Sequence, residues 1–269
     1  MKNSFEFKEK YNVYDLVDII RILRSENGCP WDIKQTHESI KKNLIEETYE
    51  TIEAINKKDP DMLREELGDV LMQVVFHAQM ETEKGVFNID DVADENCKKL
   101  IERHPHVFGE VNVNGVDDVL TNWDAIKRKT KGQKSTSEAI DSIPRELPAL
   151  MRATKVQQMA AKAGFDWDEV NGALDKLSEE IEELKAAVAN GDKANINEEL
   201  GDVLFSAVNV SRFVDTDAEE ALTDATDKFV GRFKTVEALA AERGIDMKES
   251  DIETLDRLWD EAKHNNLSK

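Results

Sequence analysis

The sequence carries one acidic pattern twice, with a constant number of residues between the copies. Each copy has the form EExxE followed by ExxD, at Glu46–Glu50 and Glu66–Asp69 in the first half and at Glu179–Glu183 and Glu199–Asp202 in the second. The offset is the same at both ends of the pattern (179 − 46 = 133 and 202 − 69 = 133), so no residue has been gained or lost between the acidic clusters. This self-similarity predicts a tandem repeat of one structural unit.

Apolar residues recur at helical spacing along both halves. Helices are predicted over about residues 13–26, 38–56, 60–83, 92–103, 116–129 and 149–163, with an irregular elbow at Cys29–Asp32. The second acidic pair of helices is expected to turn its apolar residues inward, namely Leu174, Leu177, Ile181, Leu184, Val188, Leu200, Val203, Leu204, Ala207 and Val208. No stretch shows the period of two that is typical of a strand. The sequence therefore predicts an all-α fold built from two helical bundles.

A polar segment of small residues, Thr130–Ser137, lacks any apolar periodicity. Such composition is typical of a linker between domains. We expect an N-terminal helical domain over residues 1–130, a linker over 131–142 and a C-terminal helical domain over 143–269.

The charge balance excludes some classes of partner. The chain has 57 acidic and 36 basic residues, a net charge of −21, whereas nucleic acids and anionic membranes attract basic surfaces. The longest nearly apolar stretch, Val70–Phe76, is too short to span a bilayer, and residues 1–10 lack the apolar core of a secretory signal. Two cysteines without a CxxC pair fit a reduced protein. We expect a cytoplasmic protein without nucleic-acid or membrane partners.

The spacing of the acidic residues predicts a metal site. On a helix Glu47 and Glu50 lie one turn apart, as do Glu66 and Asp69, so an antiparallel helix pair directs four carboxylates at one point. Mutual repulsion and desolvation make such a cluster unfavourable unless a cation lies within it. A hard divalent ion fits, and Mg²⁺ is usual where a phosphate supplies further ligands. The alternative is a solvated acidic helix face, which repetition at one fixed offset disfavours.

Basic and aromatic residues recur downstream of each acidic pair. Lys99 and Arg103 in the first half, like Lys228 and Arg232 in the second, are spaced to share one helix face and to bind phosphate oxygens. Exposed surface pairs would show the same spacing. The tryptophans of the two halves, Trp123 and Trp259, are candidates for stacking on a nucleobase, with packing in the core as the alternative.

Four motifs together resemble a known family. They are the two EExxE…ExxD pairs, GCPWD at Gly28–Asp32, RHPHVF at Arg103–Phe108 and IPRELPALMRA at Ile143–Ala153. This combination, which covers nearly the whole chain, resembles the two-domain MazG proteins, which are nucleoside triphosphate pyrophosphohydrolases. The resemblance implies an all-α fold whose helix pairs assemble across a homodimer. It also implies dependence on Mg²⁺, with Mn²⁺ as a substitute, and hydrolysis of NTPs or dNTPs to the monophosphate and pyrophosphate.

The resemblance also assigns roles to individual residues. It makes metal ligands of Glu180, Glu183, Glu199 and Asp202 in the second copy and of Glu47, Glu50, Glu66 and Asp69 in the first. It places the nucleotide in the C-terminal copy, beside Lys176, Glu179, Lys228, Arg232 and Trp259. The five acids, the basic pair and the tryptophan occur in both copies, so the sequence does not decide which copy is active.

The mechanism expected from these charges is attack of a metal-activated water on the α-phosphorus. Glu179, or Glu46 in the first copy, is the candidate base, because the first Glu of EExxE recurs although two ligands from that helix would suffice. Three alternatives stay open: a non-catalytic Mg²⁺ or nucleotide sensor, a purely structural helical repeat, and a sister activity such as dUTP or phosphoribosyl-ATP hydrolysis.

Overall fold

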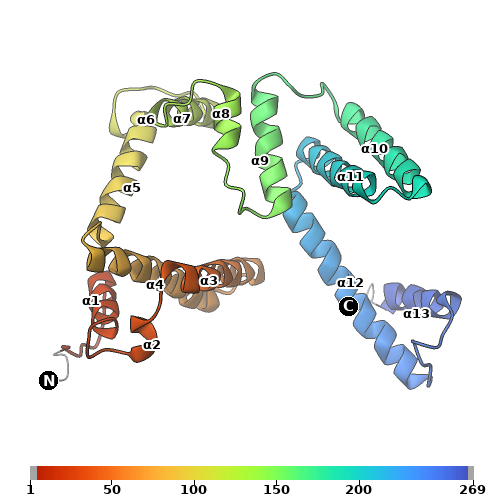
Figure 1. Cartoon of the computed structure of the whole chain (residues 1–269), viewed down its shortest axis with the longest axis horizontal. Coiled ribbons are helices and arrows are strands. Elements are labelled where there is room, and N and C mark those ends of the chain that lie inside the picture. Colours follow the sequence, from red (N-terminus) through yellow and green to blue (C-terminus); the bar gives the residue numbers. More distant parts are fainter. Residues whose placement is uncertain (1–4, 266–269) are drawn as a thin grey trace. The chain divides into compact units, whose positions relative to one another are not determined.

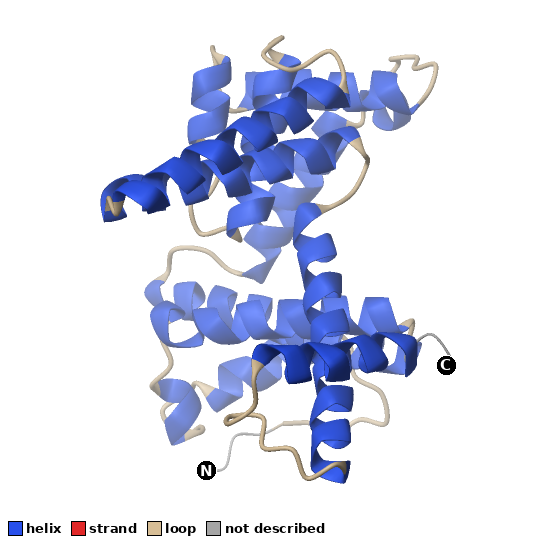
Figure 2. Ribbon diagram, turned by 90° about the vertical axis from the view of Figure 1, so that its right-hand side faces the viewer, coloured by secondary structure: helices blue, strands red, loops and turns tan. Residues whose placement is uncertain are grey.

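The computed structural model describes residues 5–265, and within that range it contains thirteen α-helices and no strand (Figures 1 and 2). The all-α prediction is confirmed. The chain forms two compact units, Met1–Lys127 and Arg128–Lys269. No helix within residues 5–265 combines the length and the apolar content needed to cross a bilayer.

The first unit is built around an antiparallel hairpin of two long helices, α3 (His37–Lys57) and α4 (Pro60–Lys84). Local signals define its ends. Thr36 and Ser39 form a capping box at the start of α3, and Asp59 caps α4 with Pro60 at its first position. Gly85, with φ +70°, ends α4 in the left-handed region. The expected helix boundaries here are correct to within about two residues.

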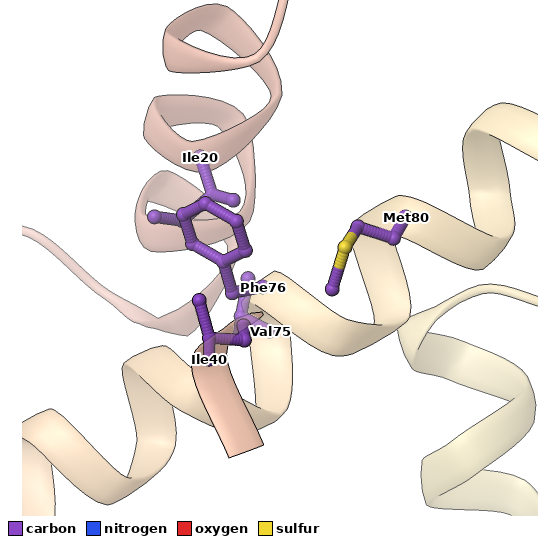
Figure 3. Close-up of a cluster of buried hydrophobic side chains, with 5 residues drawn as sticks. All are labelled: Ile20, Ile40, Val75, Phe76 and Met80. Carbon is purple, nitrogen blue, oxygen red and sulfur yellow. The ribbon is translucent and has the colours of Figure 1, made fainter. Parts of the chain in front are cut away.

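The hydrophobic core of the first unit lies near the open end of this hairpin, where α1 (Val13–Leu23) packs on α4. Figure 3 shows its buried members, which are Ile20, Ile40, Val75, Phe76 and Met80. The remaining helices of this unit are α2 (Pro30–Ile33), α5 (Ile89–Arg103), α6 (Pro105–Phe108) and α7 (Val116–Thr130), whose last residues cross the boundary between the units. The core therefore leaves the middle of the hairpin free to carry polar groups.

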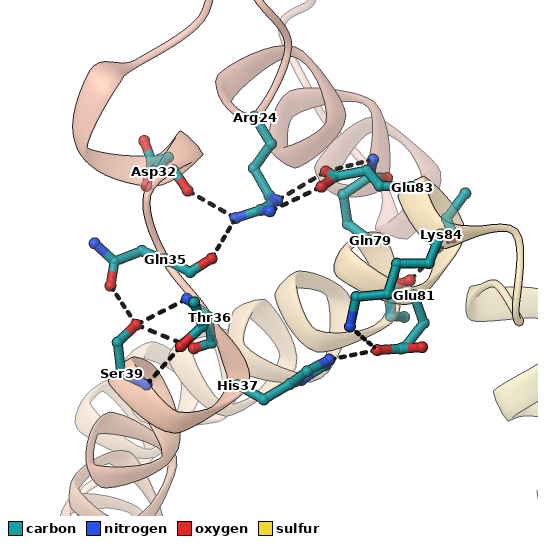
Figure 4. Close-up of polar contacts among 12 residues, drawn as sticks. Arg24, Asp32, Gln35, Thr36, His37, Ser39, Gln79, Glu81, Glu83 and Lys84 are labelled. Atoms are coloured by element: carbon teal, nitrogen blue, oxygen red, sulfur yellow. Dashed lines mark hydrogen bonds and ion pairs between the residues drawn. The ribbon is translucent and has the colours of Figure 1, made fainter.

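Arg24 holds the irregular segment between α1 and α3 in place. The expected irregular segment contains a single helical turn, α2, and the Nη1 atom of Arg24 donates to the backbone oxygens of Asp32 (2.7 Å) and Gln35 (3.2 Å). Its Nε and Nη2 atoms donate to the carboxylate of Glu83 on α4, each at 2.8 Å (Figure 4). This bidentate ion pair, in which the arginine side chain is buried and the glutamate is 35% exposed, holds the segment between α1 and α3 against the end of the hairpin.

The second unit repeats the hairpin with α10 (Val170–Asn190) and α11 (Lys193–Phe213). Gly191, with φ +71°, and the N-cap Asp192 form the turn between them. Helix α9 (Ala149–Lys162) packs on α11, and α12 (Ala218–Glu242) packs on α9 and on α13 (Ile252–Asn265). The core between α12 and α13 contains Val236, Ala240, Leu258 and Ala262. The short α8 (Thr136–Asp141) lies within the segment expected to be a linker, and that domain division stays a prediction.

The expectation that the apolar stripe of the second hairpin faces a core is wrong for much of its length. Leu174, Ile181 and Val188 on α10 are 42%, 38% and 58% exposed. On α11, Leu200 and Leu204 are 47% and 50% exposed. Burial of such a stripe is worth roughly 25 cal/mol per Å² of apolar area, so this face is suited to a protein partner.

Candidate metal and nucleotide site

Three carboxylates of the second hairpin converge on one point. Glu180 lies on α10, while Glu199 and Asp202 lie one turn apart on α11. One carboxylate oxygen from each residue can be chosen so that all three atoms lie within 4.8 Å of one another. Glu180 is only 6% exposed, so its charge is held where water solvates it poorly. The fourth predicted ligand, Glu183, lies close enough to Glu180 for the charge of Glu180 to contribute to the raised pKa of Glu183.

The first hairpin contains the same arrangement. Glu47 on α3 and the pair Glu66 and Asp69 on α4 also place one oxygen each within 4.8 Å of one another, and Glu50 lies close enough for its charge to contribute to the raised pKa of Glu47. The structure thus brings together three predicted ligands in each repeat and places the fourth beside them.

These carboxylates oppose one another's ionisation. Burial, followed by the charges of Asp69 and Glu50, raises the pKa of Glu47, and burial followed by the charges of Glu180 and Asp202 raises the pKa of Glu199. The pKa values of Glu66 and Glu183 are raised by the same two kinds of cause. A divalent cation removes this repulsion, and its preferred ligands are carboxylate oxygens. The residues therefore fit a hard divalent ion.

A lysine distinguishes the two clusters. The Nζ atom of Lys176 lies 2.9 Å from Glu179 Oε1 and 2.8 Å from Glu180 Oε1, and these contacts raise the pKa of Lys176. The position 133 residues earlier is Asn43, which carries no charge. The acidic motifs do not reveal this difference between the repeats, because Lys176 lies three residues before EExxE.

The two candidate bases lie at the edge of their clusters. The Glu179 side chain is 57% exposed and is held by Lys176, whereas Glu46 is exposed on α3. Neither is among the three converging carboxylates. Both are thus placed where a carboxylate can accept a proton from water without acting as a ligand itself.

In each repeat, the predicted arginine lies against the predicted tryptophan. The Arg103 guanidinium lies 5.3 Å from the Trp123 ring centroid, and that of Arg232 lies 5.9 Å from Trp259, which also contacts Phe229 at 5.1 Å. Both tryptophans are half-buried, which fits the packing alternative for part of each ring. Lys99 and Lys228 are exposed on α5 and α12.

The same basic groups do not complete the acidic clusters within their own units. Among residues 5–265, no hydrogen bond, ion pair or ring contact joins Lys228, Arg232 or Trp259 to the carboxylates of α10 and α11, and the same holds for Lys99, Arg103 and Trp123 with α3 and α4.

Two glycines beside the clusters have open surroundings. A Cβ atom added to Gly68 or Gly201 would meet no atom within 4 Å. Within the described part of the chain, no other element therefore approaches either glycine closely. Each follows an exposed leucine, Leu67 at 51% on α4 and Leu200 at 47% on α11.

The sequence is similar to known proteins. The MazG nucleotide pyrophosphohydrolase domain matches residues 35–108 and 168–237, which contain both acidic hairpins. A Thermotoga maritima protein named nucleoside triphosphate pyrophosphohydrolase/pyrophosphatase MazG is 49% identical over 249 residues, covering 93% of this chain and 94% of that protein.

Two further relatives align over similar lengths. An Escherichia coli nucleoside triphosphate pyrophosphohydrolase is 45% identical over 255 residues, covering 94% of this chain and 97% of that protein. A Bacillus subtilis protein named uncharacterized protein YabN is 49% identical over 248 residues, which are 91% of this chain and 50% of that protein. With a repeated acidic hairpin and a domain match in each half, the chain belongs to the MazG nucleotide pyrophosphohydrolase family.

Proposed function

We propose that this chain hydrolyses nucleoside triphosphates, including dNTPs, to the monophosphate and pyrophosphate. The observation that carries the proposal is the convergence of Glu180, Glu199 and Asp202 on one point of a hairpin matched by the MazG domain. The relatives from Thermotoga maritima and Escherichia coli, which bear this activity in their names, support it because they align with more than nine tenths of the chain.

The carboxylates of the second hairpin would hold the metal. Glu180, Glu183, Glu199 and Asp202 supply the oxygen ligands that Mg²⁺ prefers, and Mn²⁺ suits the same donors. When bound, such an ion lowers the pKa of a coordinated water and stabilises charge on phosphate oxygens. Glu47, Glu50, Glu66 and Asp69 form the corresponding set in the first hairpin.

Other side chains would position the substrate and move the proton. Glu179 accepts the proton of the attacking water, and Lys176 both holds Glu179 and compensates phosphate charge. Attack at the α-phosphorus releases pyrophosphate, whose charge Lys228 and Arg232 compensate. Because these two residues do not contact the acidic cluster of their own unit, we assign them to the cluster of a second subunit.

A homodimer would also bury the apolar stripe. The stripe contains the exposed Leu200, and the adjacent Gly201 has open space around it, so the backbone of another helix can approach there. Two copies of this hairpin would form a four-helix bundle with the carboxylates inside. Both cysteines, Cys29 and Cys97, are free, which supports a cytoplasmic location.

The second repeat is the proposed active copy. Its cluster has Lys176 between Glu179 and Glu180, whereas the first repeat has Asn43 at that position. The first repeat keeps the ligands and Glu46, so it retains the capacity to bind a metal. We propose that the first repeat contributes little turnover, because a triphosphate bound there would meet Asn43 in place of the positive charge of Lys176.

Replacement of Lys176 by Gln tests this role. We expect kcat/KM to fall about 10- to 100-fold, because a hydrogen bond between charged groups contributes about 1.5–3 kcal/mol. Steady-state kinetics measures the change. Lys185→Gln is the matched control, since Lys185 lies on the same helix and pairs with Glu182 in solvent. Equal losses in the two variants would contradict the assignment.

Metal binding should raise the melting temperature by mass action. At 100 times the dissociation constant, Mg²⁺ is expected to raise the Tm of the second unit by roughly 5–10 °C. The raised pKa values of Glu183 and Glu199 mean that protons compete with the ion at low pH. The increase should therefore be larger at pH 7.5 than at pH 5, as calorimetry can show. A Tm that is insensitive to Mg²⁺ would favour the purely structural alternative.

The reaction products identify which phosphate bond is cleaved. The chain is incubated with a panel of NTPs, dNTPs, dUTP and phosphoribosyl-ATP, with and without Mg²⁺, and the products are separated by anion exchange. Monophosphate and pyrophosphate, formed only with the metal, are expected from several NTPs. Diphosphate and phosphate would contradict cleavage at the α-phosphorus, and binding without turnover would indicate a sensor. Turnover confined to one of the last two substrates would indicate a sister activity.

A further inference from the structure

A cavity of about 430 Å³ lies in the second unit between α9, residues 164–167 and α11. Its volume is within the range of protein pockets that bind small organic molecules. The wall is mostly apolar and includes the rings of Trp167 and Phe205, while Gln157 and Asn209 contribute polar groups. A mostly apolar wall with a few polar groups is typical of a ligand site.

The first repeat fills the corresponding place with two large side chains. The glycine that precedes the tryptophan segment recurs at an offset of 136 (164 − 28 = 136), so Ala160 on α9 corresponds to Arg24. At the offset of 133 found for the acidic residues, Asn209 corresponds to Phe76. The Arg24 guanidinium lies 5.2 Å from the centroid of the Phe76 ring, which is buried. The smaller Ala160 and Asn209 both line the cavity, which therefore occupies the place of this packed pair.

A buried glutamine in the wall has an unsatisfied acceptor. Gln157 is 6% exposed, and its Nε2 atom donates to the backbone oxygen of Phe205 at 2.8 Å. This bond leaves Oε1 as the acceptor of the amide, and Oε1 is buried without a hydrogen-bond partner among residues 5–265. An unsatisfied buried acceptor costs free energy, so the position suits a ligand that carries an N–H donor.

The chain holds the aromatic part of the wall in place. A Cβ atom added to Gly172 of α10 would lie 2.7 Å from Cε3 of Trp167, so the indole rests on α10 where only a glycine leaves room. Trp167 is nevertheless 47% exposed and Phe205 is 44% exposed, which leaves ring surface for a ligand. A flat heteroaromatic ring gains stacking energy on such surfaces, whichever nucleobase it belongs to.

The charged groups of the wall neutralise each other. The Nη2 atom of Arg212 lies 2.6 Å from Oδ2 of Asp166, and its Nη1 atom donates to Oδ1 of Asn209 at 2.7 Å. All three residues line the cavity. Because Asp166 compensates the guanidinium, this edge suits an uncharged ring better than a phosphate group.

The cavity adjoins the acidic cluster along the same helix. Phe205 and Asn209 follow Asp202 by three and seven residues, which are spacings that share one face of a helix. Along the axis of α11 they lie about 5 and 10 Å beyond Asp202. One nucleotide can therefore reach the cluster with its phosphates and the cavity with its base.

We propose that the cavity between α9 and α11 binds the nucleobase of the nucleotide whose phosphates meet the second acidic cluster. The Oε1 atom of Gln157 accepts from an N–H group of the base. Each common base has such a group on its Watson–Crick edge, so the contact admits all of them. This inference rests on the proposed hydrolysis of nucleoside triphosphates, and it assigns the base to residues other than Trp259.

Binding without turnover tests the site. Calorimetry with Mg²⁺ measures the affinities of α,β-methylene-ATP and of inorganic tripolyphosphate for the full chain and for Asn209→Phe, which fills the cavity with the residue of the first repeat. The variant should bind α,β-methylene-ATP about 10-fold or more weakly, because base stacking is lost, and should bind tripolyphosphate as the wild type does. Lys155→Phe, which places the same ring at an exposed position of α9, should keep both affinities.

The outcomes separate this inference from the proposed hydrolysis. Weaker binding of α,β-methylene-ATP to Asn209→Phe, together with an absence of ATP turnover in the wild type, would support the base site and contradict the hydrolysis. Unchanged binding of α,β-methylene-ATP to Asn209→Phe would overturn the base site. If that variant also forms a weaker dimer in sedimentation, the cavity is occupied by a second copy of the chain instead of a base.

A second measurement does not depend on the filled cavity. The α,β-methylene analogue of purine riboside triphosphate keeps the ring and phosphates of the ATP analogue but lacks the 6-amino group. The wild type should bind the ATP analogue about 2- to 10-fold more tightly, and Gln157→Met, which removes the acceptor at similar length, should bring the ratio close to one. A ratio that Gln157→Met leaves unchanged, or one that is lost in Trp259→Phe instead, would overturn the assignment.

Discussion

Replacing Glu199 by Gln is expected to lower kcat/KM for NTP hydrolysis by at least about 100-fold, because the cluster then loses one anionic ligand and part of its transition-state charge stabilisation. The same change at the matching position of the first repeat, Glu66→Gln, is expected to leave most of the activity. The contrast follows from Lys176, which the first repeat replaces by Asn43. Glu198→Gln changes an exposed neighbour on α11 and serves as the control.

The same variant should be more stable than the wild type when no metal is present. Burial and neighbouring carboxylates raise the pKa of Glu199, so at pH 7.5 its ionised form is disfavoured in the folded chain relative to the unfolded chain. This penalty appears as the pH rises above the ordinary pKa of glutamate, and an amide removes it. We therefore expect a higher Tm in chelator and a smaller response to Mg²⁺. A loss of activity in Glu66→Gln as large as that in Glu199→Gln would contradict the assignment of activity to the second repeat.

Glu179→Gln is expected to reduce kcat by about 10²- to 10⁴-fold, the range for loss of a general base, while nucleotide binding is kept. Binding should persist because Glu180, Glu199 and Asp202 stay in place, and a glutamine can still accept from Lys176. Calorimetry with an α,β-methylene NTP measures the affinity, and single-turnover kinetics measures the chemical step.

A matched control for this variant lies three residues further along α10. Glu182→Gln removes an exposed carboxylate that pairs with Lys185, so it should leave both affinity and turnover near the wild-type values. Retained turnover in Glu179→Gln would refute the base assignment. Loss of affinity together with turnover would instead show that Glu179 acts in binding.

Local rules predicted the helices that carry the site. The N-cap Asp59, the Pro at position 60 and the terminal Gly85 define α4 from adjacent residues alone, so its ends could be predicted from the sequence. The convergence of Glu180 with Glu199 required only helical spacing and an antiparallel turn at Gly191, which are also local properties. The site residues themselves stay predictions until their substitution is measured.

Features that depend on what packs against each helix could not be predicted in the same way. Periodicity showed that Leu174 and Ile181 form a stripe, but it could not show that they stay 42% and 38% exposed in the described chain. Likewise, Lys176 gains its role only from the two acids beside it, and Gln157 only from the cavity between its helix and α11. Such contacts involve residues that do not belong to any recognisable sequence motif.

The central claim is that the carboxylates of the second hairpin jointly hold the metal that hydrolysis requires. The most direct measurement is electron paramagnetic resonance of Mn²⁺ with an α,β-methylene NTP, comparing the wild type with a variant carrying Glu180→Gln, Glu199→Gln and Asp202→Asn. The wild type should bind Mn²⁺ at the second hairpin, and the variant should lose that ion and all turnover with ordinary NTPs. Unchanged Mn²⁺ binding and unchanged hydrolysis in the triple variant would contradict the account.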